Sequence, residues 1–257
     1  MSVAVPSGDR RRGLLGPAVL ALVGLAVLIG LGTWQVERKA WKEGLIAMLD
    51  ERLSAAPVAL PASAAWPQLT QQADEFRRVR FRAEFLNDQE ALVYTAGSSF
   101  RPDVAGAGYW VFTPARLSDG SLVVINRGFV PLGKEDAASR PDGQVRGPVE
   151  VIGALRWPEK PGLFTPNGDP ARNLWFARDH LAMAEAKHWG AVAPFYVEQE
   201  APQPPGGLPR AGRVQPNLPN NHLQYAITWY GLAAVLAVLF AIWAWGRRRE
   251  ERAARRP

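Results

Sequence analysis

Two long stretches of the sequence contain no charged side chain. Residues 13–34 form an uncharged run of 22 residues, and residues 223–246 form a second run of 24 residues. At about 1.5 Å per residue, a helix of this length covers roughly 33 Å, the thickness of a membrane's hydrocarbon core. The first run is too long for the apolar part of a signal peptide and no Ala-x-Ala site follows it. We therefore predict two transmembrane helices, with the first one retained as an anchor.

Helical spacing continues beyond the first apolar run. Trp34, Arg38, Trp41 and Leu45 recur at intervals of three and four residues, which places them on one face of a helix. We expect the first helix to extend past the membrane with its aromatic rings at the interface. Arg38 and Lys42 can then reach lipid phosphates.

The sequence between the two runs shows the alternation typical of strands. In residues 77–86, Val79, Phe81, Ala83 and Phe85 alternate with charged side chains, which gives one core face and one solvent face. Weaker strand patterns, separated by Gly, Pro and Asp turns, occur at 91–96, 109–114, 122–125, 149–155, 173–176 and 195–198. Because no long helices separate them, we predict a mainly antiparallel β domain, a barrel or a sandwich, with one or two short helices.

Two segments of this domain have other patterns. Asp179 can cap a short helix that runs from His180 to about Trp189, and Gly190 supplies its end. Residues 201–219 contain six prolines and three glycines, which predicts an extended tether and not a packed element. The predicted organisation is a tail at 1–12, a transmembrane helix at 13–34, the β-rich domain at 35–222, a second transmembrane helix at 223–246 and a basic tail at 247–257.

The distribution of charge predicts how the chain is oriented. Of the net charge of +6, all lies in residues 1–34 and 223–257, which hold 9 arginines against 3 acidic residues. Arginine triplets at 10–12 and 247–249 flank the two runs, so the positive-inside rule places both termini in the cytoplasm. Only about a dozen residues precede the first run, which is short for a mitochondrial transit peptide. We therefore predict a bacterial inner membrane protein with a periplasmic central domain.

The same composition excludes several classes of protein. Residues 35–222 hold 21 basic and 21 acidic residues, so the domain lacks the basic surface that nucleic acids require. The absence of cysteine excludes disulfides, thiolate metal sites and cysteine nucleophiles. There is also no nucleotide-binding glycine motif and no nucleophile elbow. We predict that the protein is not an enzyme.

The three histidines differ in their positions. His180 and His188 are eight residues apart on the predicted short helix, which is not the i, i+4 spacing of a zinc pair. We expect both to be surface residues. His222 stands instead at the outer mouth of the second apolar run.

The residues that follow His222 leave two interpretations open. Tyr225 and Trp229 lie at i+3 and i+7 on its helix face, and Gln224 and Thr228 form a second polar pair. An imidazole there can ligate a haem iron while the macrocycle lies against the rings. It can equally be an interfacial histidine that hydrogen-bonds headgroups or the domain, with ordinary aromatic belt residues below it.

Three ordered motifs connect the chain to a known family. They are LGTWQ at 31–35, followed by Arg38, Trp41 and Lys42; NRGFVP at 126–131; and NNHLQYA at 220–226, followed by TWYGLA at 228–233. A shorter match combines Asn173, Trp175 and Asp179. Together with the two apolar runs, these segments resemble the Surfeit locus protein 1 family of cytochrome c oxidase assembly factors, over residues 13–245. From its residues alone, the NRGFVP segment is expected to be a strand ending in a tight glycine turn closed by Pro131.

This resemblance implies a function and a site. The function is that of a membrane-anchored, non-enzymatic assembly factor for haem–copper (cytochrome c type) oxidase, which binds haem A and aids its insertion into oxidase subunit I. Subunit I, haem A synthase and membrane lipid are the implied partners. By position, His222 is the implied iron ligand, and Tyr225, Thr228 and Trp229 are candidate walls of the haem pocket.

Other roles remain open beside these. Arg38, Lys42 and Arg127 could pair with haem propionates, although phosphate anchoring and, for Arg127, a local ion pair or turn contact are simpler. A cofactor-free scaffold that stabilises an oxidase intermediate is the alternative function. A membrane-tethered hydrolase or sensor is a third, and it would need a polar catalytic cluster that the sequence does not offer.

Overall fold

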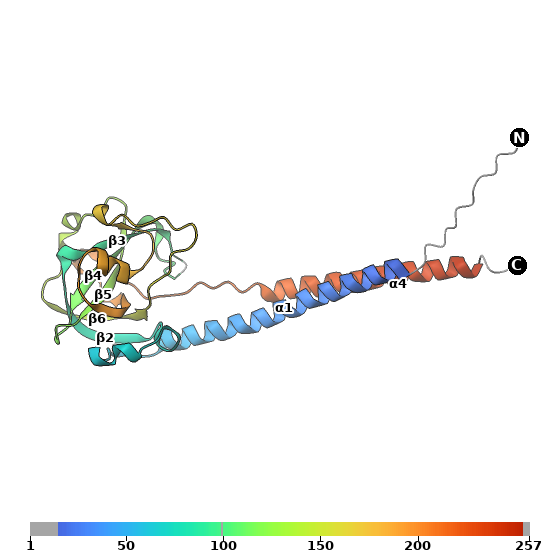
Figure 1. The fold of residues 1–257 in the computed structure, drawn as a ribbon, viewed down its shortest axis with the longest axis horizontal. Helices are drawn as coiled ribbons and strands as arrows, with labels where there is room; N and C mark the ends of the chain where they lie inside the picture. Colours follow the sequence, from blue (N-terminus) through green and yellow to red (C-terminus); the bar gives the residue numbers. More distant parts are fainter. Residues whose placement is uncertain (1–14, 99, 254–257) are drawn as a thin grey trace, which may run out of the picture. The chain divides into compact units, whose positions relative to one another are not determined.

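The computed structural model describes residues 15–98 and 100–253, and it contains two long helices and an eight-stranded sheet (Figure 1). The helices are α1 (Leu15–Ser54), α2 (Gln71–Asp74), α3 (His180–Ala186) and α4 (His222–Ala253). The strands are β1 (Val58–Ala59), β2 (Arg78–Phe85), β3 (Ala91–Gly97), β4 (Ala105–Arg116), β5 (Leu122–Pro131), β6 (Pro148–Arg156), β7 (Leu174–Trp175) and β8 (Val192–Ala201). The predicted tail at 1–12, the first residues of the first apolar run and residues 254–257 lie outside the described residues.

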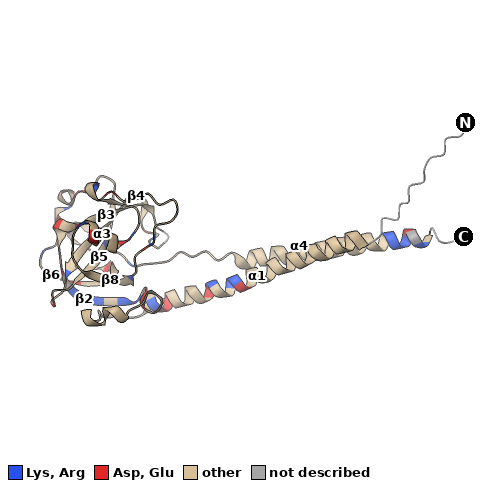
Figure 2. Cartoon of the chain, viewed as in Figure 1, with Lys and Arg blue, Asp and Glu red and all other residues tan. Residues whose placement is uncertain are grey.

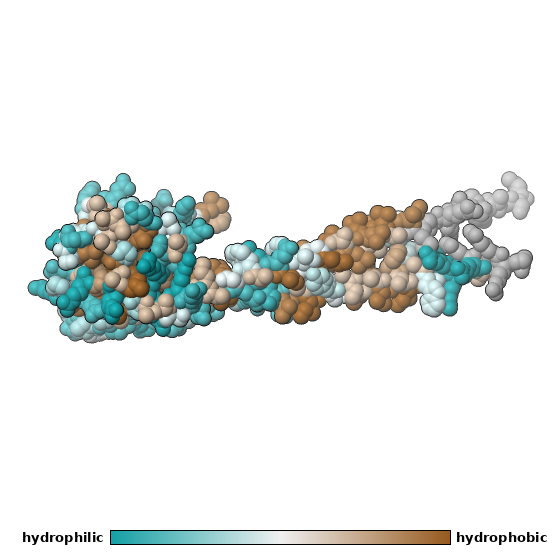
Figure 3. All heavy atoms as spheres, turned by 90° about the horizontal axis from the view of Figure 1, so that it is seen from below, coloured by the Kyte–Doolittle hydropathy of each residue, from teal (hydrophilic) through white to brown (hydrophobic). Residues whose placement is uncertain are grey.

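The chain divides into two compact units. One contains residues 15–46 and 219–253 of the described chain, and the other contains residues 47–218. Both α1 and α4 are long and apolar enough to cross a membrane. Figure 2 shows that charge on α4 is confined to its last turns, beyond a long uncharged stretch, and Figure 3 shows the apolar surface of both helices. The predicted extension of the first helix past Trp34 is confirmed, because α1 continues without a break to Ser54.

In the helical unit, small residues line the contact between α1 and α4. Ala226 and Ala233 of α4 are buried seven residues apart, the repeat that keeps one helix face on its partner. Gly32 of α1 is buried too, and a Cβ there would lie 2.7 Å from the ring of Tyr230. Without side-chain bulk at these positions, the two backbones can approach closely.

In the second unit, five strands close into a barrel. Their hydrogen-bonded order is β2-β6-β8-β5-β4, and the pairing of Phe85 on β2 with Ala115 on β4 closes the ring. The ring is antiparallel except between β5 and β8, which run parallel. β3 extends the sheet from β4, and the short strands β1 and β7 pair in parallel with β2 and β3. The predicted mainly antiparallel β domain is confirmed as a barrel.

Two hydrophobic clusters cover the two faces of this sheet. The barrel interior holds one, which includes Val79, Ile125 and Phe195. The other lies between α3 and the outer faces of β4, β5 and β8, and it includes Met183 and Tyr196. Because β4, β5 and β8 are buried on both faces, they lack a simple alternation of apolar and polar residues. This explains why β4, β5 and β8 extend beyond the predicted 109–114, 122–125 and 195–198.

The short helix α3 is capped as predicted but is otherwise different. Asp179 accepts hydrogen bonds from the backbone N–H groups of Leu181 and Ala182. The helix ends at Ala186, before the predicted Trp189, and His188 has a left-handed φ of 56°. The expectation that His180 is a surface residue is wrong, because its side chain is fully buried under the helix and its Nε2 lies 3.0 Å from the carbonyl oxygen of Ala193. His188 is exposed, as expected.

Two further expectations are corrected around the NRGFVP motif. The motif is not a glycine turn, because all its residues lie within β5 and Gly128 instead carries an irregularity of the strand with φ of 122°. The tether at 201–219 is not free of packing: Arg210 pairs with Phe129, and Ala211 and Val214 are each only 2% exposed. Gly128 permits this, because a Cβ there would lie 2.1 Å from the carbonyl oxygen of Arg210.

Candidate functional site

His222 is the first residue of α4 and faces α1. Its Nδ1 lies 2.6 Å from Oε1 of Gln35, and the Gln35 side chain belongs to a residue only 8% exposed. Because a carboxamide oxygen only accepts hydrogen bonds, Nδ1 carries the imidazole proton. Nε2 is then the nitrogen that carries the lone pair of the neutral ring, and it makes no hydrogen bond within the described residues.

Several contacts hold the two helices in register at this point. Thr33 and Tyr230 approach through their hydroxyl oxygens at 3.1 Å. Thr33 is about half a turn from Gln35 on α1, and Tyr230 is about two turns from His222 on α4. Lys42 donates through Nζ to the carbonyl of Pro219, just before α4 begins. The position of the imidazole is therefore fixed by contacts on both sides of it.

The predicted pocket walls lie at different angles around α4. Trp229 is half-buried, and Tyr225 is 55% exposed, so its ring is available beside the imidazole. Thr228 lies six residues from His222, about 120° around the helix. Its hydroxyl donates to the carbonyl of Gln224 at 2.9 Å. The structure thus brings Tyr225 and Trp229 to the side of His222 and leaves Thr228 on another face.

The three cations considered as propionate partners have protein partners already. Arg38 stacks on the ring of Trp41, with its guanidinium carbon 3.9 Å from the ring centroid. Lys42 is engaged with Pro219 as described above. Arg127 lies in the barrel unit, where its side chain is 3% exposed and pairs with Glu90 at 3.0 Å. The simpler interpretation of Arg127, an ion pair, is the one observed.

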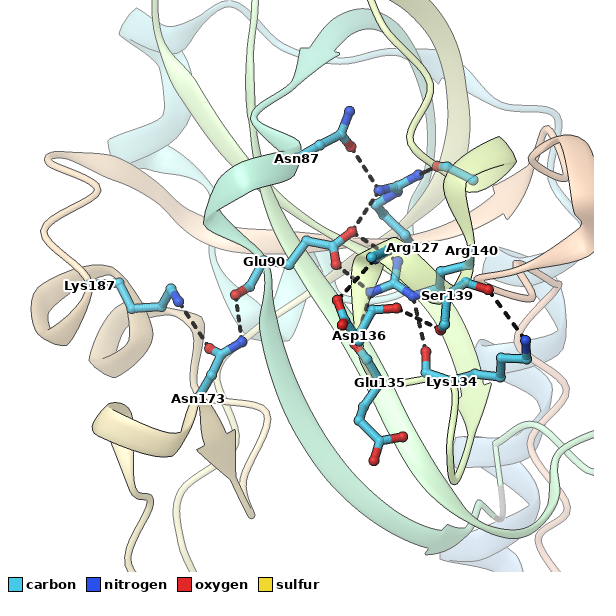
Figure 4. A network of polar contacts seen from close by, with 12 residues as sticks. Asn87, Glu90, Arg127, Lys134, Glu135, Asp136, Ser139, Arg140, Asn173 and Lys187 are labelled. Carbon is cyan, nitrogen blue, oxygen red and sulfur yellow. Dashed lines mark hydrogen bonds and ion pairs between the residues drawn. The ribbon is translucent and has the colours of Figure 1, made fainter.

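Arg127 belongs to a buried network of charges (Figure 4). Glu90 accepts from Nη1 of Arg127 and Nη1 of Arg140, each at 3.0 Å, and both arginine side chains are almost completely buried. Asn87 Oδ1 also accepts from Nη1 of Arg127, and the carbonyl of Gly143 accepts from its Nη2. Burial lowers the pKa of Arg127 to about 10, against the opposing effect of Glu90.

The chemistry available at His222 is ligation through Nε2 of one imidazole. No group of three histidine, aspartate or glutamate side chains that could hold a metal ion occurs in the described part of the chain. A metal held here would have to bring most of its own ligands, as the iron of a porphyrin does. The donor set of the site fits a haem and does not fit a bare metal ion.

Gln35 is the site residue that the sequence did not single out. It closes the LGTWQ motif, and it lies on the α1 face that contacts α4. A signal was present, because Gln35 is an uncharged polar residue in the same turn as the motif's Thr33. Its pairing with a residue 187 positions away required the register of the two helices.

Comparisons with a family model and with individual known proteins point to the same family. The model of the SURF1 family matches residues 22–234. A SURF1-like protein of Monosiga brevicollis is 37% identical over 255 residues, which cover 96% of this chain and 93% of that protein. Surfeit locus protein 1 of Rattus norvegicus is 36% identical over 84% of this chain and 71% of its own length. Surfeit locus protein 1 of Homo sapiens is 36% identical over 82% of this chain and 72% of its own length.

The matched region contains all three motifs, most of α1, the complete barrel and the first 13 residues of α4. The site residues Gln35 and His222 both fall inside it. On a family match over most of its length and relatives at this level of identity, the chain belongs to the SURF1 family.

Proposed function

We propose that this protein is a membrane-anchored assembly factor for haem–copper (cytochrome c type) oxidase, which binds haem A through His222 and aids its insertion into oxidase subunit I. It acts without catalysing a reaction, and its partners are subunit I, haem A synthase and the surrounding lipid. Family membership supports the connection to oxidase assembly, and the geometry of His222 supports the connection to haem.

The observation that carries the proposal is the hydrogen bond from His222 Nδ1 to Gln35 Oε1. Histidines that ligate metals commonly donate their other ring N–H to a fixed acceptor, which sets the tautomer and strengthens the ligand. Gln35 is such an acceptor, and with Nδ1 as the donor, Nε2 is the ring nitrogen that can offer its lone pair to an iron. An interfacial histidine that only contacted headgroups would not need a buried partner.

The surroundings of His222 suit the two ends of haem A. When bound, the haem supplies an iron that accepts the imidazole, a long apolar tail and two anionic propionates. The exposed ring of Tyr225 and the half-buried ring of Trp229 offer aromatic surface to the macrocycle. His222 begins the apolar helix, so the tail can enter lipid while the propionates stay in water.

The proposed location is a bacterial inner membrane, with both termini in the cytoplasm and the barrel in the periplasm. The arginines at 247–249 at the end of α4 support this orientation. It also places His222 and Gln35 at the periplasmic end of the helix pair. A reporter fused to either end of the chain would test it, and an active periplasmic reporter there would contradict it.

The test of haem binding is the absorption spectrum of the full chain, purified in detergent from cells that make haem A. We expect a haem spectrum from the wild type and from the His188→Ala variant, which removes an exposed histidine elsewhere. The His222→Ala variant should lose most of the haem. Equal haem content in the wild type and His222→Ala would overturn the ligand assignment, and a colourless wild type would favour the cofactor-free scaffold.

A further inference from the structure

At one end of the barrel, the side chains that face the interior change from apolar to polar. Along β5, the interior-facing position after Ile125 is Arg127, and along β8 the position after Val197 is Gln199. Both Arg127 and Gln199 are buried, at 2% and 5% exposure. Polar residues that mark the mouth of a barrel merely because water reaches them would be exposed, and these two are not.

Arg127 and Gln199 lie side by side. Asn126 on β5 pairs with Glu198 on the parallel strand β8, so the residues that follow them occupy neighbouring positions with side chains on the same face. Strands so paired are about 4.8 Å apart. A guanidinium and a carboxamide therefore stand next to each other at the end of an apolar interior.

A cavity of about 240 Å³ opens beside them. Its walls are the interior side chains Phe85 and Val149 and the proline-rich segment that follows β8, including Pro202 and Pro204. The cavity is thus mainly apolar, and the polar side chains in its wall are Arg127, Gln199 and Gln203. Binding pockets for small molecules commonly combine apolar walls with a few fixed polar groups and occur at the mouths of barrels.

Two polar groups at this cavity keep unused hydrogen-bonding capacity although both side chains already have protein partners. Gln199 donates through Nε2 to the carbonyl of Pro202 at 2.8 Å, but its buried Oε1 has no donor within the described residues. Arg127 Nε likewise makes no hydrogen bond within the part of the chain that the structure describes. The cavity therefore offers a ligand two groups: the N–H of the positively charged Arg127 as a donor, and Oε1 of Gln199 as an acceptor.

The charge of the surroundings favours an anion. Arg127 and Arg140 share the single carboxylate of Glu90, so these three paired side chains hold two positive charges and one negative charge. Glu135 also belongs to this region: Arg140 contacts its backbone carbonyl, and its carboxylate oxygen Oε2 is buried without a hydrogen-bond partner within the described residues. A buried charge without a full counter-charge is unfavourable, and an anionic ligand in the cavity would offset that cost.

We propose that the mouth of the barrel binds a small organic carboxylate with an apolar side chain and a neighbouring N–H. Arg127 holds the carboxylate, Gln199 Oε1 accepts the N–H, and the side chain packs against Phe85 and Val149. This chemistry is found in a free N-acylated amino acid and in the last residue of a peptide. The site is separate from His222 and does not depend on haem binding.

The test uses the full chain in detergent and N-acetyl-leucine as the probe, with binding measured by calorimetry. We expect binding of the acid and at least about tenfold weaker binding of its methyl ester, which cannot pair with Arg127. Isovalerate, which lacks the N–H, should also bind more weakly. A pentapeptide ending in leucine, compared with N-acetyl-leucine, distinguishes a chain terminus from a free acid as the better ligand.

Variants test the position of the site. Val149→Trp should fill the cavity and weaken binding by about tenfold or more, whereas Val58→Trp, at a position 42% exposed, should not. Gln199→Leu is a second variant, in which the side chain has nearly the same volume. It should weaken the binding of N-acetyl-leucine but leave the binding of isovalerate unchanged. The proposal is overturned if N-acetyl-leucine does not bind at about 10 mM, if its methyl ester binds equally well, or if a folded Val149→Trp protein binds as the wild type does.

Discussion

The ring of Tyr230 lies directly against Gly32, so closely that a Cβ at position 32 would be 2.7 Å from a ring carbon. The same tyrosine reaches Thr33 through its hydroxyl, at 3.1 Å. These contacts set the spacing and register of α1 and α4 immediately below the pair formed by Gln35 and His222. The position of the proposed haem ligand therefore depends on the absence of a side chain at residue 32.

A first prediction follows for Gly32. Gly32→Leu should force α1 and α4 apart, because the added side chain meets a rigid ring. The chain has no cysteine, so spin labels on single cysteines at the exposed positions Val23 and Val235 report the separation without other changes. We expect a longer and broader distance distribution. Gly30→Leu is the control, since a Cβ at Gly30 meets nothing within 4 Å, and equal effects of the two variants would refute the explanation.

A second prediction concerns Gln35. Gln35→Leu removes the acceptor for Nδ1 of His222 and should weaken haem binding by about 10- to 100-fold, as the loss of such partners does in other metal sites. Gln35→Glu keeps an acceptor and should retain most of the affinity. Titration of the purified variants with haem measures both. Wild-type affinity in a folded Gln35→Leu protein would show that the hydrogen bond does not serve ligation.

A third prediction concerns Gly128 in the NRGFVP motif. Gly128→Ala should destabilise the barrel by about 3 kcal/mol or more, because the new methyl group would lie 2.1 Å from the carbonyl oxygen of Arg210 and the backbone is already at φ of 122°. Gly133→Ala is the matched control: its φ is 81°, and a Cβ there meets nothing within 4 Å. It should cost only about 1 kcal/mol. Chemical unfolding followed by tryptophan fluorescence compares them, and similar losses would contradict the steric argument.

A fourth prediction concerns pH. Burial lowers the pKa of His180 from 6.5 to about 4, against weaker opposing effects of the Ala193 carbonyl and Asp179. Because the unfolded chain takes up this proton first, the free energy of unfolding should fall as the pH decreases from about 6.5 to 4, by about 3 kcal/mol in total. Above pH 6.5 the histidine is neutral in the folded and the unfolded state, so it no longer makes the free energy of unfolding depend on pH.

His180→Gln tests this assignment. The glutamine cannot titrate, and its amide can still donate to the carbonyl of Ala193 that His180 contacts. The variant should therefore lose most of the pH dependence between 4 and 6.5, whereas His188→Gln, at an exposed position, should keep it. An unchanged pH profile in folded His180→Gln protein would assign the dependence to other groups.

Sequence patterns predicted the fold where a single rule operates. β2 shows strict alternation because one of its faces meets the core and the other meets solvent, and its observed bounds differ from the predicted 77–86 by one residue at each end. Both apolar helices are also predictable from the sequence, because their length and lack of charge suffice to recognise them. The parallel two-residue strand Val58–Ala59 was missed, since only its tertiary pairing with β2 defines it.

The less predictable parts depend on contacts between distant segments. His180 carries a polar side chain on a short amphipathic helix, and only the packing of α3 over Tyr196 shows that it is buried. The segment at 201–219 has the composition of a tether. Because Gly128 has no side chain, Arg210 of this segment can nevertheless pair with Phe129 of β5. At the proposed haem site, the position of His222 at the start of a span is visible in sequence, whereas its bond to Gln35 depends on how two helices meet.

Near the point where the chain leaves the barrel, Arg213 donates through Nη2 to the carbonyl of Leu53, close to where the chain enters it. The barrel is therefore an insertion whose two ends are joined by a hydrogen bond from the side chain of Arg213. Residues 47–218 could be produced as a water-soluble fragment without a lipid environment, and new termini could be opened at a surface turn such as the one around Gly120. Ligand screening and crystallisation could then proceed on the barrel alone.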